Sequence, residues 1–138
     1  MDKKRDSFSL VQALEQSISK LVEKFLPKNN FTVFAQGELT KLWAEIEQME
    51  PKMSIIEADK VVDVILKRAG VAGSTMAERL RKVQKLVPRP VYSGMWEAHK
   101  IRNELVHEVG NRTNPTVAQE NLWKMKKFLI SLGAFKNE

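Results

Sequence analysis

Arg102, Asn103 and His107 are the residues of this chain whose types and spacing best suit chemistry. They lie in the run Arg-Asn-Glu-Leu-Val-His, which the periodicity of the surrounding apolar residues predicts to be helical. An arginine guanidinium can hold a phosphate through paired hydrogen bonds, and an imidazole can give or take a proton near neutral pH. This compact set of groups is typical of phosphate handling, and it points towards RNA.

Arg102 falls within an arc of apolar side chains on the predicted helix. The arc comprises Met95, Ala98, Ile101, Leu105, Val106 and Val109. Because arginine keeps its charge inside a protein, Arg102 needs a carboxylate, a backbone carbonyl or a bound anion, or its stem must carry the guanidinium to water. Asn103 and His107 are four positions apart and share one side of the helix, with His99 one turn earlier. We expect a polar seam there, with His99 as an auxiliary group.

His107 is expected in the last turn of this helix. Gly110 and the Asn-Arg-Thr-Asn-Pro run after it indicate a helix C-terminus. The negative end of the helix dipole favours a protonated imidazole at such a position. His107 is therefore well placed for proton transfer.

A second functional signal is a cluster of positive charge before the motif helix, offset only by Glu78. The whole chain carries a net charge of +6 and has a pI near 9.6. Such a cluster can neutralise phosphates, although a merely solvated basic helix face is the alternative interpretation. The predicted RNA-binding residues are Arg79, Arg81, Lys82, Lys85 and Arg89.

The composition restricts the remaining function classes. The absence of cysteine excludes disulfides, thiolate metal sites and cysteine nucleophiles. His99 and His107 are the two histidines and lie eight residues apart without an HExxH motif, so we expect neither a metal nor another cofactor. No apolar run is long enough for a membrane span or a signal peptide, so we expect a cytoplasmic protein that does not enter a membrane.

The periodicity predicts an all-α bundle of five to six helices in a single domain, residues 1–138, with residues 1–6 flexible. Ser7 and Pro27 bound the first helix, and the second runs from near Ala35 to before Pro51. Ser54 with Glu57, and Thr75 with Glu78, have capping-box spacing and open the next two, which end near Gly70 and Val87. The motif helix spans about 93–109, and the last begins at Pro115 behind an Asn114 cap and ends at Gly133.

The Arg102-Asn103-x-x-x-His107 motif, on a late helix of a small basic all-helical domain, resembles the signature of the HEPN superfamily (higher eukaryotes and prokaryotes nucleotide-binding domain). The resemblance implies a homodimer that brings two motifs together in a cleft at the interface. It also implies RNA binding and metal-independent endoribonuclease activity, often in toxin–antitoxin or defence systems where an antitoxin is a protein partner. In this interpretation His107 transfers the proton, Arg102 holds the scissile phosphate, and Asn103 orients the phosphate or the imidazole.

Three other functions fit parts of the sequence. A non-catalytic helical module that binds a protein partner would use Arg102 only in a structural ion pair. A nucleotide-binding pocket without chemistry also stays open, because the chain has no glycine-rich phosphate loop that would decide the matter. Sequence-specific DNA binding is less favoured, since the residues around Gly70 and Gly73 lack the composition of a recognition helix.

Overall fold

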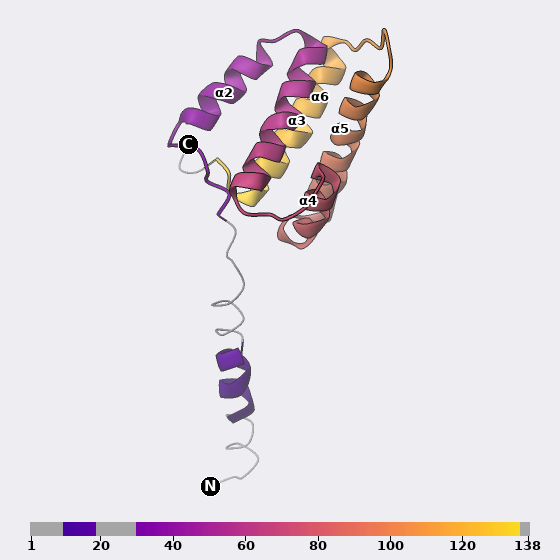
Figure 1. Ribbon diagram of the computed structural model, residues 1–138. Helices are drawn as coiled ribbons and strands as arrows, with labels where there is room; N and C mark the ends of the chain where they lie inside the picture. Colours follow the sequence, from indigo (N-terminus) through magenta and orange to yellow (C-terminus); the bar gives the residue numbers. More distant parts are fainter. Residues whose placement is uncertain (1–9, 19–29, 136–138) are drawn as a thin grey trace.

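The structure, a computed structural model, describes residues 10–18 and 30–135, and within these ranges it contains helices but no strand (Figure 1). The prediction of an all-α bundle of five to six helices is confirmed. Residues 10–18 are helical. The helices that follow are α2 (Glu38–Glu47), α3 (Pro51–Arg68), α4 (Met76–Lys82), the 3-10 turn η1 (Gln84–Leu86), α5 (Arg89–His107) and α6 (Pro115–Leu132).

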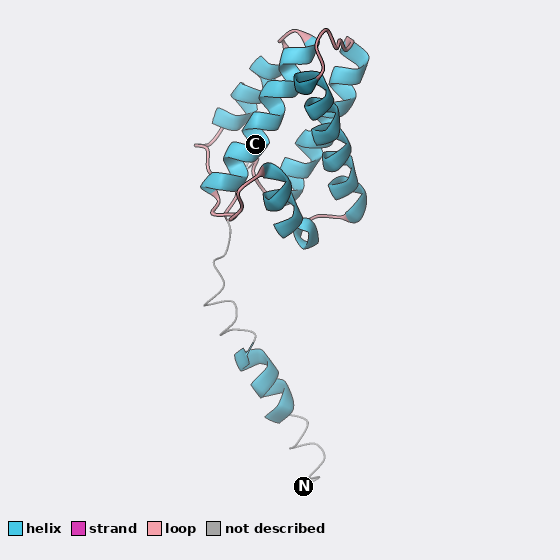
Figure 2. Cartoon of the chain, turned by 45° about the vertical axis from the view of Figure 1, so that its right-hand side comes forward, coloured by secondary structure: helices cyan, strands magenta, loops and turns pink. Residues whose placement is uncertain are grey.

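Helix α3 is the centre of the bundle, because it contacts α2, α4, α5 and α6. It lies beside α6, and α5 packs against both α3 and α6 (Figure 1). Helices joined by loops make up the bundle in the described part of the chain (Figure 2). The buried face of α3 carries apolar residues at helical spacing, and α6 places Met125, Phe128 and Leu129 against it with no exposed surface. Trp43 of α2 is also buried, at 1% exposure. Helix α5, which carries the Arg102–His107 motif, thus packs on the same hydrophobic core through α3 and α6.

The start of α3 differs from the prediction. The helix begins at Pro51, and the cap is the Glu50 carboxylate, which accepts hydrogen bonds from the backbone nitrogens of Lys52 and Met53 at 3.2 and 3.3 Å. Ser54 lies inside the helix, where its hydroxyl donates to the carbonyl of Pro51 at 2.7 Å. Proline suits the first helical position because its missing N–H would have no partner there. The expected Ser54 capping box was therefore wrong.

Two other boundaries moved by four residues or more. Helix α4 ends at Lys82 rather than near Val87, because Val83 leaves the helical conformation and the chain tightens into η1, with Leu86 N bonded to Val83 O at 3.0 Å. Val87 is extended, as the residue before a proline prefers. Helix α5 starts at Arg89, four residues before the expected position.

The caps of α4 and α6 agree with the prediction. Thr75 Oγ1 accepts from Glu78 N at 3.2 Å, and Asn114 Oδ1 accepts from Val117 N at 2.9 Å. Gly133 ends α6 in the left-handed conformation, with φ of 82°, which glycine adopts without strain.

The predicted first helix is only partly described. Residues 10–18 are helical, and Leu10 and Leu14 are more than half exposed. The Ser7 cap, the Pro27 end and residues 1–6 lie outside the described residues. In the parts of the chain that the structure describes, no helix has the length and apolar character needed to cross a membrane.

Candidate functional site

Arg102 of α5 pairs with a carboxylate from another helix. Its Nε lies 3.5 Å from Oδ2 of Asp59 on α3, whose side chain is 4% exposed. The Nε atom is buried and makes no hydrogen bond within the described residues, so this contact is an ion pair at longer range. The Arg102 side chain is still 32% exposed. Of the partners that the sequence allowed, the structure selects the carboxylate and leaves part of the guanidinium in water.

Asp59, His99, Asn103 and Arg102 form a closed set of polar contacts, which we call the Asp59 ring. His99 Nδ1 lies 2.9 Å from Asp59 Oδ1, and Asn103 Nδ2 lies 3.5 Å from His99 Nε2. Arg102 Nη1 donates to Asn103 Oδ1 at 3.0 Å. The ion pair between Arg102 and Asp59 closes the ring.

The ring defines where the protons sit. The Asp59 carboxylate can only accept a hydrogen bond from His99, so Nδ1 carries the hydrogen and Nε2 of a neutral ring presents its lone pair. That lone pair faces the amide nitrogen of Asn103, while the amide oxygen faces Arg102. The chain of donors and acceptors is therefore consistent around all four residues, and it fixes the orientation of the Asn103 amide.

Asp59 was missed by the sequence analysis. It is 3% exposed and lies between Ala58 and Val61 in the apolar stripe of α3. A carboxylate within such a stripe is rarely buried without a partner, so its position was a usable signal. Asp63 lies one turn after Asp59 on the same side of α3 and gives the same signal.

His107 is the last residue of α5, and its side chain is exposed. It makes no hydrogen bond or ion pair with the residues that the structure describes, and Asn103 faces His99 instead. The predicted polar seam therefore contains His99 and Asn103 but does not extend to His107. His99, expected as an auxiliary group, is buried at 8% exposure. Arg102 and His107, five positions apart, point about 140° away from each other around the helix axis.

Arg79 is a correction to the predicted RNA-binding set. Its side chain is 7% exposed, and its Nε and Nη2 donate to Asp63 at 2.7 and 3.1 Å, while Nη1 donates to the carbonyl of Gly73 at 2.5 Å. The charge of Arg79 is thus paired with Asp63 inside the fold, so Arg79 does not contribute to a basic surface that could bind RNA. Met76, Leu80 and Val83 are buried, so position 79 lies on the inner face of α4.

The pair also changes the ionisation of Asp63. Burial by itself raises the pKa of this carboxyl, but hydrogen bonds from Arg79 and Lys67, together with their charges, outweigh burial and hold the pKa below its usual value. Asp63 is therefore a carboxylate that stabilises the fold in its ionised form. The remaining residues of the predicted RNA-binding set are exposed: Arg81, Lys82, Lys85 and Arg89.

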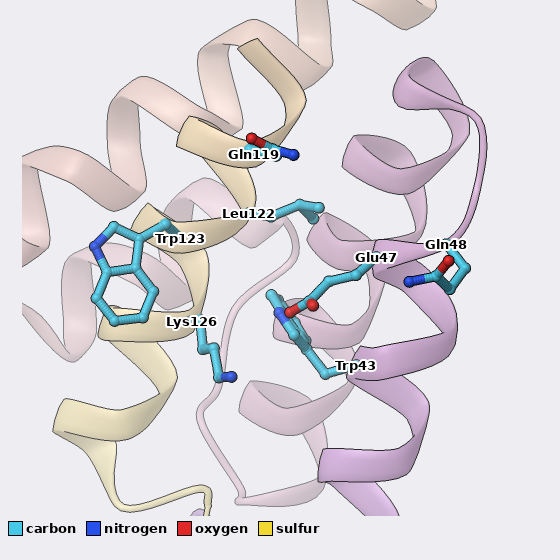
Figure 3. A pocket seen from close by; sticks show the side chains of 7 residues that line it. All are labelled: Trp43, Glu47, Gln48, Gln119, Leu122, Trp123 and Lys126. Carbon is cyan, nitrogen blue, oxygen red and sulfur yellow. The ribbon is translucent and has the colours of Figure 1, made fainter. Parts of the chain in front are cut away.

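The surface of the described residues includes the following two hollows. One, of about 370 Å³, lies on α5 next to the Asp59 ring and is lined by Trp96, Glu97, His99, Lys100 and Asn103. The other, also about 370 Å³, lies between α2 and α6, where Trp43 and Glu47 of α2 project toward Leu122 and Lys126 of α6 (Figure 3). None of the residues predicted for the site lines this second hollow.

No group of three or more histidine, aspartate or glutamate residues able to hold a metal ion occurs within residues 10–18 and 30–135. We define the candidate site as the Asp59 ring, the adjoining hollow on α5 and the exposed His107. Comparison of the chain with protein-family models, curated proteins and solved structures found no match.

Proposed function

We propose that this chain is a HEPN-like RNA-binding protein that acts as a metal-independent endoribonuclease in homodimeric form. The observation that carries the proposal is the partly exposed guanidinium of Arg102, held by Asp59 and Asn103 on the helix that ends at the exposed His107. This combination offers a fixed phosphate-binding group and a free proton-transfer group. A cytoplasmic location belongs to the same proposal.

Arg102 keeps donors for a phosphate. Nη1 is bonded to Asn103 and Nε faces Asp59, whereas Nη2 makes no hydrogen bond within the described residues. Because the ring holds the guanidinium plane, less side-chain freedom is lost when an anion binds. Asp59 also balances the charge of Arg102, so the arginine is stable without the phosphate.

The geometry of α5 supports a homodimer as part of this proposal. Since Arg102 and His107 of one chain diverge around the helix, both can reach one phosphate more readily when the histidine comes from a second copy. Val106, within the motif, and Val109, just after it, are 39% and 106% exposed. These apolar side chains suit a contact between two copies of the end of α5.

The proposed reaction is an internal phosphoryl transfer. The ribose 2′-oxygen attacks the phosphorus, the bond to the 5′-oxygen of the next nucleotide breaks, and the products are a 2′,3′-cyclic phosphate and a free 5′-hydroxyl. The 2′-hydroxyl loses one proton and the leaving 5′-oxygen gains one; His107 makes one of these two transfers and the solvent makes the other. Arg102 stabilises the charge that develops on the phosphate. The nucleophile belongs to the substrate, so the step needs no bound water or metal.

The test incubates the full chain with RNA in EDTA and analyses the fragment ends, while light scattering measures the oligomeric mass. We expect cleavage with cyclic phosphate ends, and a loss of about 100-fold or more in His107→Ala and Arg102→Ala. Arg112→Ala is the matched control, because Arg112 is an exposed arginine in the loop after α5 and should be dispensable. Intact RNA after incubation with a folded dimer would refute the ribonuclease.

A non-catalytic interaction module is the second candidate, and the Asp59 ring favours it. Arg102 and His99 contact Asp59 and so join α5 to α3, and Asn103 links the two of them on α5. Such contacts are what a purely structural role requires. Under this alternative, Arg102→Ala lowers the free energy of unfolding while RNA is neither bound nor cut.

A further inference from the structure

The hollow on α5 next to the Asp59 ring has an aromatic wall. Trp96, Lys100 and Asn103 follow one another at helical spacing and so line one side of the helix. The Trp96 side chain is only partly buried, and the volume of about 370 Å³ is within the range of small-molecule sites. The hollow thus offers a planar apolar surface beside the proposed phosphate-binding arginine.

The orientation of Trp96 is set by its neighbours. Its ring packs edge-to-face against Tyr92, with centroids 6.2 Å apart at 83°, and against His99, at 6.0 Å and 74°. His99 is in turn held by Asp59 at 2.9 Å. A planar ligand would therefore stack on an indole that is already in place, which lowers the entropic cost of binding.

The charges around the hollow suit a ligand that carries a phosphate. Lys100 is exposed on its edge, and Arg102 donates a hydrogen bond at 3.0 Å to Asn103, which lines the hollow. The one carboxylate in the wall, Glu97, is paired with Lys124 of α6 at 2.9 Å. Its negative charge is thereby offset, and the two cations around the hollow, Lys100 and Arg102, leave its surroundings positive.

We propose that this hollow binds a nucleobase of the RNA strand whose phosphate lies at Arg102, with the base stacked on Trp96 and the neighbouring phosphate near Lys100. The inference rests on the proposed function and adds a base-binding subsite to it. His99 and Asn103, the polar side chains nearest the base, have their hydrogen-bonding atoms engaged in the Asp59 ring. Stacking rather than hydrogen bonding holds the base, so the subsite accepts all four bases with similar affinity.

The experiment follows, by NMR spectroscopy, the indole N–H signals of the three tryptophans in the full chain. The probes are a 2′-O-methyl hexanucleotide, which lacks the attacking hydroxyl, together with AMP and ribose 5-phosphate. We expect the hexanucleotide to shift the Trp96 signal, AMP to do so more weakly, and ribose 5-phosphate to leave it unchanged. Trp123, which is 53% exposed and lines the other hollow, is the internal control and should not move.

Each outcome separates the subsite from the nuclease. Arg102-dependent binding of the hexanucleotide with an unmoved Trp96 signal would overturn the subsite and leave the proposed function standing. A Trp96 shift without cleavage of ordinary RNA would support the subsite and refute the nuclease. AMP binding as tight as that of the hexanucleotide would overturn the assignment to an RNA strand, because a free nucleotide would then be the ligand.

Variants give a second measurement. Trp96→Leu should weaken binding of the hexanucleotide by roughly 5- to 160-fold, the usual effect of losing one base–aromatic stack, whereas Trp123→Leu should not weaken it. Because Trp96 packs against Tyr92 and His99, its replacement can also disturb the fold. Lys100→Gln is therefore a second variant, at an exposed position where the fold is not disturbed. It should weaken binding and reduce its salt dependence. Unchanged affinity in both variants would overturn the proposal.

Discussion

The Asp59 ring predicts that Asp59→Asn lowers the free energy of unfolding by about 2 kcal/mol at neutral pH. Two unit charges 3.5 Å apart, as Asp59 and Arg102 are, attract each other by about 5 kcal/mol at an effective dielectric constant of about 20. The net loss is smaller because Arg102 is about one-third exposed and water screens it, and because the substitution removes the cost of burying the carboxylate. The hydrogen bond with His99 loses its charge assistance as well.

A double-mutant cycle isolates the pair. The free energy of unfolding is measured by urea denaturation, followed by circular dichroism, for the wild type, Asp59→Asn, Arg102→Gln and the double variant. We expect a coupling energy of at least about 1 kcal/mol, because removal of either partner already abolishes the attraction. A control cycle combines Asp59→Asn with Arg112→Gln, because Arg112 has no ion pair within the described residues. The coupling energy between Asp59 and Arg112 should be close to zero.

Two results would contradict this reasoning. A coupling energy below about 0.5 kcal/mol would mean that Asp59 and Arg102 act independently, within the usual additivity of separate sites. A more stable Asp59→Asn variant would mean that the desolvation of Asp59 exceeds all the attraction that its partners provide.

Three further predictions concern single residues. Because the pKa of Asp63 is lower in the folded chain than in the unfolded one, its ionised form stabilises the fold above about pH 4, and this stability is lost as the pH falls through the lowered pKa. Asp63→Asn should therefore cost about 3 kcal/mol at pH 7 and flatten the acid branch of the stability curve, and an unchanged acid branch in thermal unfolding would argue against it. Asn114→Ala should cost about 1 kcal/mol in urea denaturation through loss of the α6 cap, whereas Asn114→Gly should cost only a few tenths, and equal losses would exclude the cap as the cause. His107→Ala should change the unfolding free energy by less than about 0.5 kcal/mol because the side chain is exposed, so a large destabilisation would show that His107 has a structural role.

Much of the fold could be predicted because each helix signal is local. Apolar residues at helical spacing, the Thr75 and Asn114 caps and Gly133 define a helix through contacts of a residue with its own next turn. The error at Ser54 arose where two capping signals competed within four residues. Glu50 with Pro51 offers two backbone hydrogen bonds and a proline suited to the first turn, whereas Ser54 bonds back to the turn before it.

The candidate site could be predicted only in part. His99 and Asn103 come together on one helix, as their spacing indicated, whereas His107, expected in the same seam, lies apart. Arg102, expected in the apolar arc, bonds to Asn103. Asp59 belongs to a helix more than forty residues earlier, and no local pattern names it as the partner of Arg102. Arg79 shows the opposite error, since a basic cluster read along the sequence does not tell which of its members faces inward.

The sequence by itself determined the helices, their order and the placing of an arginine, an amide and two histidines on one of them, because helix formation depends on residues within a few positions of each other. The tertiary structure decided which charged side chains form ion pairs inside the fold and which are exposed to solvent. Asp59 meets His99 and Arg102, and Asp63 meets Arg79, only when α3 packs against its neighbours. A buried charge must find its partner across that packing, and the partner's distance along the chain has no bearing on it.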